Sequence, residues 1–234
     1  MSIEEICKKY GIKNYTINDD GSIDVDGYVY LHGYGLTELP LKFNKVIGNF
    51  NCSNNELTSL KGCPKEVTGT FHCSDNNLTS LEGSPKEVSG QFYCGGNKLT
   101  DLKGCPKSIG GEFYCVNNNL TSLEGGPESI GGDFNCKLNN LTSLKGSPKS
   151  VTGGFYCVSN ELTDLKGSPE SVGYDYDCGS NNLTSLEGSP KSVGGDFDCR
   201  INKLTDLKGS PESVGNGFHC FGNRLTSLKG SPES

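Results

Sequence analysis

The chain has 234 residues, 33 of them Gly and 12 of them Cys, with 32% hydrophobic residues and a formal net charge of −7. This mildly acidic balance argues against a nucleic-acid-binding protein, which needs a basic stripe to neutralise phosphates. No run of about 18 apolar residues occurs, so no membrane span is predicted. Low apolar content is typical of disordered chains. Here, however, the apolar residues recur at a fixed interval, which predicts an ordered repeat protein.

Residues 1–24 do not repeat, and they are predicted to form an N-terminal cap. The sequence IEEICKKY places Ile3, Ile6 and Cys7 on one face of a short helix. The sequence YTINDDGSIDV then predicts a β-hairpin that turns at Asp20-Gly21. A helix and a hairpin covering the open end of the first repeat would shield its apolar residues from water.

Residues 25–234 divide into ten units of 21 residues without an insertion, with the pattern V-x-G-x-F-x-C-x-x-N-x-L-T-x-L-x-G-x-P-x-x. The first unit departs most, with Val29, Leu31 and Tyr34 at the Phe, Cys and Asn positions. The Phe and Cys are two residues apart, so on an extended strand both point to one face. Each unit is therefore predicted to add one short parallel strand to a stack. Leu57, Leu60 and Val67, with their equivalents, turn inward to form a continuous core. The Pro step predicts an extended, mostly non-helical return side.

Two polar or reactive columns share the same period. An Asn recurs every 21 residues from Asn55 to Asn223, where its amide can satisfy the backbone of a sharp turn. Nine Cys recur from Cys52 to Cys220, which favours a ladder of small buried side chains over disulfides or a zinc site. Cys63 and Cys105 replace Ser in the G-S-P step, and these two are predicted to be surface or rim thiols.

The pattern F-x-C-x-x-N-x-L-T-x-L resembles the leucine-rich-repeat motif over residues 25–234. Its 21-residue unit is similar to the repeats of secreted bacterial E3-ubiquitin-ligase effectors, and its G-S-P variant resembles leucine-rich-repeat proteins of bacteriophages and giant viruses. The resemblance implies a right-handed superhelical solenoid that binds proteins. Those ligases carry a separate catalytic domain with a nucleophilic Cys, so their activity is not implied. A viral or phage factor that inhibits a host defence protein is the biological context the resemblance suggests.

The positions beside and between the Phe and Cys vary between units, and they are predicted to form the partner-binding concave face. Tyr93, Tyr114 and Tyr156 make an aromatic patch there, with Val116 and its neighbours Leu138 and Val158 just beyond the strands. Tyrosines beside exposed apolar residues are typical of interface anchors. Ordinary strand preference for Tyr is the alternative interpretation.

An acidic cluster lies further along the same face, and its members stand two apart on adjacent units: Asp175, Asp177, Asp196 and Asp198. Stacked strands would place these carboxylates in a square about 5 to 7 Å on a side. Glu112 and Asp133 extend the cluster toward the tyrosines. Because facing like charges destabilise a sheet, we expect a partner with a basic surface. A bound Ca²⁺ and simple solvated charge are the alternatives, and no cofactor is expected.

The last unit leaves Phe218, Cys220, Leu225 and Leu228 without a following repeat. A truncated or frayed end and end-to-end self-association are the two interpretations, and the second makes a structural assembly element the rival function. No enzyme is expected, because the three His lie far apart and no nucleophile accompanies them. The N-terminus lacks the apolar core of a signal peptide. We therefore expect a cytoplasmic protein, in the host cytoplasm if it is viral.

Overall fold

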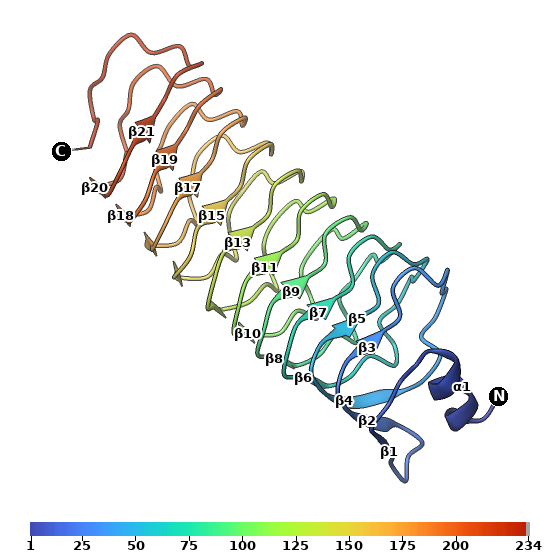
Figure 1. The fold of residues 1–234 in the computed structure, drawn as a ribbon. Helices are drawn as coiled ribbons and strands as arrows, with labels where there is room; N and C mark the ends of the chain where they lie inside the picture. The colour runs from blue at the N-terminus through green and yellow to red at the C-terminus, as the bar shows by residue number, and fades with distance from the viewer. Residues whose placement is uncertain (233–234) are drawn as a thin grey trace.

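The computed structural model describes residues 1–232, and it shows an elongated solenoid in which each 21-residue unit makes one coil (Figure 1). The N-terminus lies at one end of the stack, and the last units lie at the other. This is the repeat solenoid that the sequence predicts.

The cap contains the predicted helix and hairpin. Helix α1 (Ile3–Lys9) begins with a capping box, in which the Ser2 side chain accepts from the Glu5 backbone and the Glu5 side chain accepts from Ser2. Its residue Cys7 is buried against the first coils. Strands β1 (Tyr15–Ile17) and β2 (Ile23–Asp26) pair antiparallel, and β2 also pairs in parallel with β4 (Phe43–Ile47). The hairpin therefore starts one of the stacked sheets and is not a separate lid.

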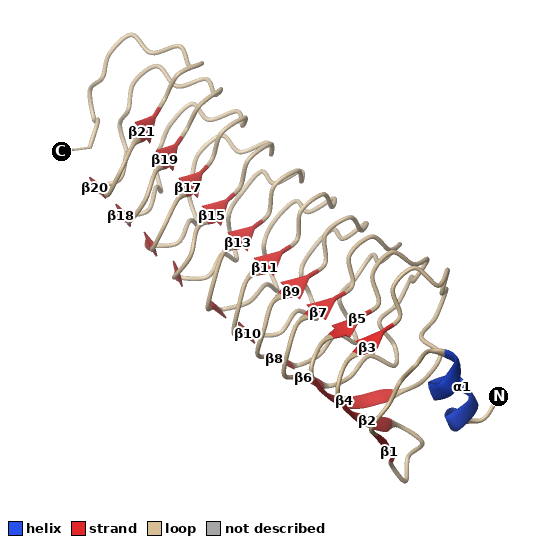
Figure 2. Ribbon diagram, viewed as in Figure 1, coloured by secondary structure: helices blue, strands red, loops and turns tan. Residues whose placement is uncertain are grey.

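One short strand per repeat forms a parallel ten-stranded sheet, which confirms the prediction (Figure 2). Its strands are in register, so that Phe113 pairs with both Phe92 and Phe134. We call the surface of this sheet the ten-stranded face. Its strands are β3 (Val29–Tyr30), β5 (Phe50–Asn51), β7 (Phe71–His72), β9 (Phe92–Tyr93), β11 (Phe113–Tyr114), β13 (Phe134–Asn135), β15 (Phe155–Tyr156), β17 (Tyr176–Asp177), β19 (Phe197–Asp198) and β21 (Phe218–His219).

A second line of two-residue strands runs along the return side, where the sequence predicts only an extended chain. These strands continue from β4 as β6 (Glu66–Val67), β8 (Glu87–Val88), β10 (Ser108–Ile109), β12 (Ser129–Ile130), β14 (Ser150–Val151), β16 (Ser171–Val172), β18 (Ser192–Val193) and β20 (Ser213–Val214). They form one sheet up to β12 and another from β14 to β20. At the break, the Thr152 hydroxyl donates to the Ile130 carbonyl at 3.4 Å. The backbone N–H makes the equivalent bond in neighbouring coils, as from Gly173 to Val151 at 2.9 Å.

The core consists of columns of identical side chains. The Phe rings stack from coil to coil, with centroids 5.1 Å apart for Phe134 and Phe155, and the Cys, Leu and Val columns are buried beside them. Tyr176 takes the Phe position in one coil, and its hydroxyl lies 2.7 Å from the Ser168 hydroxyl. No single coil encloses a core, so each depends on its neighbours for stability.

The Asn column forms a hydrogen-bond ladder, as predicted. The Asn139 amide nitrogen donates to the carbonyls of Cys115, Cys136 and Lys137, at 3.1, 3.1 and 3.2 Å. Its amide oxygen accepts from the backbone N–H of Leu120 at 3.0 Å. Each ladder Asn thus joins two consecutive coils through backbone groups that are mostly buried.

The prediction for Cys63 and Cys105 is wrong, because these thiols are only 7% and 8% exposed. The Ser of the G-S-P step turns inward, and the partly buried Ser147 hydroxyl donates to the Leu144 carbonyl at 2.8 Å. A Cys in this column therefore points into the core. All twelve Cys are free thiols, and Cys220 is the one that is not buried.

Candidate binding surface on the ten-stranded face

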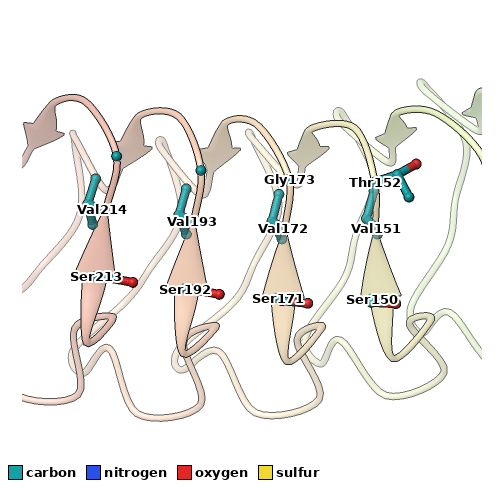
Figure 3. A pocket seen from close by; sticks show the side chains of 12 residues that line it. Ser150, Val151, Thr152, Ser171, Val172, Gly173, Ser192, Val193, Ser213 and Val214 are labelled. Carbon is teal, nitrogen blue, oxygen red and sulfur yellow. The ribbon is translucent and has the colours of Figure 1, made fainter.

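A hollow of about 590 Å³ lies on the return side. Its lining is Ser-Val-Gly in three of four consecutive coils and Ser-Val-Thr in the first, and Figure 3 shows the Val side chains in one row and the Ser hydroxyls in another. This trough carries no charged side chain and is lined by nearly the same residues in each coil. The chemically distinctive side chains lie on the ten-stranded face.

The structure brings two of the three predicted tyrosines together. The rings of Tyr93 and Tyr114, on β9 and β11, have centroids 5.0 Å apart, and both are half-buried. The Tyr93 hydroxyl donates to a Glu112 carboxylate oxygen at 3.1 Å. Burial, and then the Glu112 carboxylate, raise the pKa of Tyr93 to about 12. Tyr156 lies two coils further on, beyond Asn135, and is not part of this pair.

Tyr156 belongs instead with the acidic residues. Burial, and then the charges of Asp133 and Asp175, raise its pKa to about 12. The Lys137 ammonium lies over its ring, 4.6 Å from the centroid. Its phenol folds back over Gly154, where a Cβ would lie 2.4 Å from the hydroxyl oxygen. A Gly at position 154 therefore allows this orientation of the ring.

The four predicted acidic residues do come together. Asp177 on β17 pairs in register with Asp198 on β19. Asp175 and Asp196 lie two residues earlier in the chain, just before these strands begin. All four line a hollow of about 240 Å³, which Tyr156, Tyr176, Arg200 and His219 complete.

Each of these carboxylates accepts a hydrogen bond from backbone N–H. A carboxylate just before the strand accepts from a backbone N–H of the next coil. Asp133 accepts from the Gly154 N–H at 2.7 Å, and Asp175 accepts from the Asp196 N–H at 2.9 Å. Asp196 likewise accepts from the Gly217 N–H at 2.8 Å. These residues therefore help to hold adjacent coils together.

In the second strand position, the acceptor bonds the residue two further along the chain. Asp177 accepts from the Gly179 N–H and Asp198 from the Arg200 N–H, both at 3.0 Å. Such local bonds are characteristic of Asp and Asn at turns. The acidic square therefore has a structural role that its sequence spacing does not reveal.

Neutral Asn makes the same bonds elsewhere in this chain. Asn49 accepts from the next coil's Thr70 N–H at 2.9 Å, as Asp175 does. Asn51 and Asn135 accept from the residue two further along, at 3.0 and 3.2 Å. These hydrogen bonds therefore need the side-chain oxygen, but they do not need the negative charge.

The four carboxylates differ in their surroundings. Asp198 is only 7% exposed and forms an ion pair with Arg200. Asp177 has its pKa raised, mainly by burial and further by the nearby Asp198 carboxylate, although the Gly179 N–H opposes this. Asp196 lies 3.6 Å from the His219 ring nitrogen. Asp198 is thus neutralised within the chain, whereas Asp175, Asp177 and Asp196 face the hollow without an Arg or Lys ion pair.

Two features of this face are not among the residues predicted from the sequence. Tyr28 and Tyr30 form a stacked pair, with centroids 5.9 Å apart, and they are more exposed than Tyr93, Tyr114 or Tyr156. Their alternation beside Val29 was the available signal. The contacts of Arg200 with Asp198 and of Lys137 with the Tyr156 ring are visible only in the structure.

One parallel strand per 21-residue repeat, with buried Leu columns and an Asn ladder, determines the fold class. The fold is that of a leucine-rich-repeat solenoid. No family model and no curated protein matches the chain. Among solved structures it is similar to YopM from Yersinia enterocolitica WA-314, with 18% identity over 88% of this chain and a TM-score of 0.31. The match spans 62% of the YopM chain, and the fold class depends on the repeat geometry, not on this similarity.

Two further findings concern sites of other kinds. Within residues 1–232, no three His, Cys, Asp or Glu side chains are placed to hold a metal ion. No helix in that range is long and apolar enough to cross a membrane.

Proposed function

We propose that this protein is a protein-binding module, and that its ten-stranded face captures a partner through a basic surface of that partner. The leucine-rich-repeat fold supports a binding role in general, since stacked repeats present an extended surface whose residues can change without disturbing the core. The acidic hollow supplies the chemistry for a basic partner. The paired Tyr93 and Tyr114, with Glu112, extend the same surface by aromatic contacts.

The observation that carries this proposal is the use of Asp where Asn serves the fold equally well. Asn49 and Asn51 make the backbone bonds of their coil without a charge, whereas Asp175 and Asp177 make them with two. Facing carboxylates repel one another across a parallel sheet. A charge that lowers stability without improving the fold is expected where it takes part in binding. Here it would attract Lys or Arg side chains of a partner.

The test compares two triple variants with the same change in net charge. The first carries Asp175→Asn, Asp177→Asn and Asp196→Asn, and each Asn keeps its backbone bond. The second carries three substitutions outside the face, Asp101→Asn, Asp164→Asn and Asp206→Asn. Those Asp also accept from the N–H two residues on, at 3.0, 3.0 and 3.1 Å.

The probe is a peptide of alternating Lys and Ser, titrated by calorimetry at low and at physiological salt. The first variant should bind it about tenfold more weakly than wild type, because three charges facing the ligand at about 0.5 kcal/mol each sum to about 1.4 kcal/mol. The second variant should bind like wild type. Equal weakening in both variants would refute a site on this face, because net charge alone would then explain the binding.

A second candidate function is assembly through the last described coil. Leu228 is 66% exposed there, whereas its equivalents in inner coils, such as Leu186 and Leu207, are buried. Sedimentation over a range of concentrations tests this role, since an assembly element should change its mass with concentration. Inhibition of a host defence protein by a viral factor belongs to our first proposal as its biological context. Capture of such a host protein by the wild type, but not by the first variant, would support it.

A further inference from the structure

We infer that the rim just beyond the ten-stranded face contains two apolar contact points for a partner segment, at Leu138 with Val158 and at Ile201 with Phe221. We call these the two rim pairs. This inference rests on the proposed function, and it specifies the partner: a protein segment with two apolar side chains and a Lys or Arg between them.

The backbone before each ladder Asn has a left-handed conformation. After the first repeat, φ at this position lies between +52° and +70° in every coil. Gly, Asn, Asp and Ser fill the column in seven coils, and Leu138 and Ile201 fill it in the other two. A bulky side chain is costly in this region, and a β-branched one is a genuine outlier.

Burial does not offset this cost. Leu138 is 55% exposed and Ile201 is 57% exposed, so neither side chain gains much from the core. An Asn at either position would fit the backbone better and would be better solvated, as Asn54 and Asn117 are in their coils. A residue that the fold disfavours twice over is expected where something outside the fold contacts it.

The same arrangement occurs at both positions. The Leu138 N–H donates to the Val158 carbonyl and the Ile201 N–H to the Phe221 carbonyl, both at 3.0 Å, so each lies beside an apolar residue of the next coil. A cation precedes each one in sequence. Lys137 lies over the Tyr156 ring, and Arg200 lies 5.3 Å from the centroid of the Phe221 ring. Phe221 is itself 64% exposed.

The spacing and the charge between the rim pairs identify the occupant. Leu138 and Ile201 are three coils apart, which is about 14 Å at the usual spacing of stacked strands. Asp175 and Asp177 lie on the coil between the two pairs, Asp196 lies on the coil of Ile201, and all three face the hollow. An extended segment crosses about 14 Å in about four residues, and alternate side chains share a face. Leu-Ser-Lys-Ser-Leu therefore has both Leu and the central Lys on one side, with the Lys toward the carboxylates.

The experiment titrates this peptide, and two relatives of it, into the full chain while amide chemical shifts are followed by NMR. The relatives are Ser-Ser-Lys-Ser-Ser and Leu-Ser-Glu-Ser-Leu. Wild type should bind Leu-Ser-Lys-Ser-Leu about tenfold more tightly than Ser-Ser-Lys-Ser-Ser, since two Leu side chains contribute well over 1.4 kcal/mol even when partly covered. It should also bind it about tenfold more tightly than Leu-Ser-Glu-Ser-Leu, because the Glu would face like charges where the Lys faces carboxylates. The double variant Leu138→Asn/Ile201→Asn should bind Leu-Ser-Lys-Ser-Leu no more tightly than Ser-Ser-Lys-Ser-Ser. It should still bind the peptide of alternating Lys and Ser as wild type does.

The matched control is Ser159→Asn/Ser180→Asn, in the same left-handed column between the rim pairs. It should bind all peptides as wild type does. Thermal unfolding separates binding from folding, because Leu138→Asn/Ile201→Asn should unfold at a higher temperature than wild type. A lower unfolding temperature would mean that Leu138 and Ile201 pack in the fold, and it would overturn the inference.

Three other outcomes also overturn it, and they are distinguishable. If Leu-Ser-Lys-Ser-Leu and Ser-Ser-Lys-Ser-Ser bind wild type equally well, the rim pairs make no apolar contact with the peptide, but the proposed function still holds. Failure of every basic peptide to bind wild type removes the proposed function as well. A dimer that the Leu138→Asn/Ile201→Asn variant converts to monomer would identify a second copy of the chain as the occupant.

Discussion

Replacing Asn139 by Ala tests whether the Asn ladder holds the coils together. The side chain supplies three donated bonds and one accepted bond. The carbonyls it leaves keep other partners: Cys115 still accepts from Asn118, and Cys136 still accepts from Asn160. The Leu120 N–H has no other bond partner, so it becomes a buried unsatisfied donor.

The size of the effect follows from that difference. A buried backbone N–H without a partner costs about 1 to 3 kcal/mol, and the lost side-chain bonds add about 1 kcal/mol. We therefore expect Asn139→Ala to lower the free energy of unfolding by about 3 kcal/mol. Asn223 makes three of the four equivalent bonds in the last described coil, where it is only partly buried, so Asn223→Ala should cost less than half as much.

Urea denaturation measures both variants, and amide hydrogen exchange locates the change, since a solenoid can open one part at a time. Exchange should accelerate at Leu120 and in the adjoining coils. A third variant, Asn139→Asp, keeps the acceptor for Leu120 but turns a carboxylate toward carbonyl oxygens. Its loss of stability should shrink as the pH falls and the carboxyl becomes protonated. A loss below about 1 kcal/mol for Asn139→Ala, or an equal loss at Asn223, would refute the reasoning.

Three further predictions concern single positions. Gly146→Ala should destabilise by more than 2 kcal/mol, because φ is +95° and the Cβ would lie 2.4 Å from the backbone of the preceding coil. Gly21→Ala, at φ +74° in open space, should cost only about 1 kcal/mol, and equal losses in urea would contradict the steric account. The pKa of Asp177 is raised in the fold, mainly by burial, so the folded state loses stability as the pH rises through that pKa. The Asp177→Asn variant should therefore have a larger free energy of unfolding than wild type at pH 7, but not at pH 3. With a thiol reagent on the native protein, Cys220 should react first and the buried thiols only after unfolding; early labelling of several Cys would contradict the structure.

The candidate surface shows how far sequence reasoning reaches here. The strict period predicts which residues share a strand face, and the structure places the Asp residues around one hollow as expected. Periodicity does not predict that each carboxylate accepts a backbone N–H, because that depends on side-chain rotamers and on where the next coil lies. Nor does it separate Asp198, neutralised by Arg200, from its exposed neighbours.

The sequence by itself determined the solenoid, its 21-residue register and the inward columns of Phe, Cys, Leu and Asn. It could do so because a repeated unit places equivalent residues in equivalent environments. Only the tertiary structure decided what happens between those columns. The inward direction of the G-S-P step, which buries Cys63, and the left-handed backbone at Leu138 and Ile201 depend on how the chain closes each coil. Backbone hydrogen bonds between coils determine how each coil closes. The side-chain identities in the sequence do not directly predict those bonds.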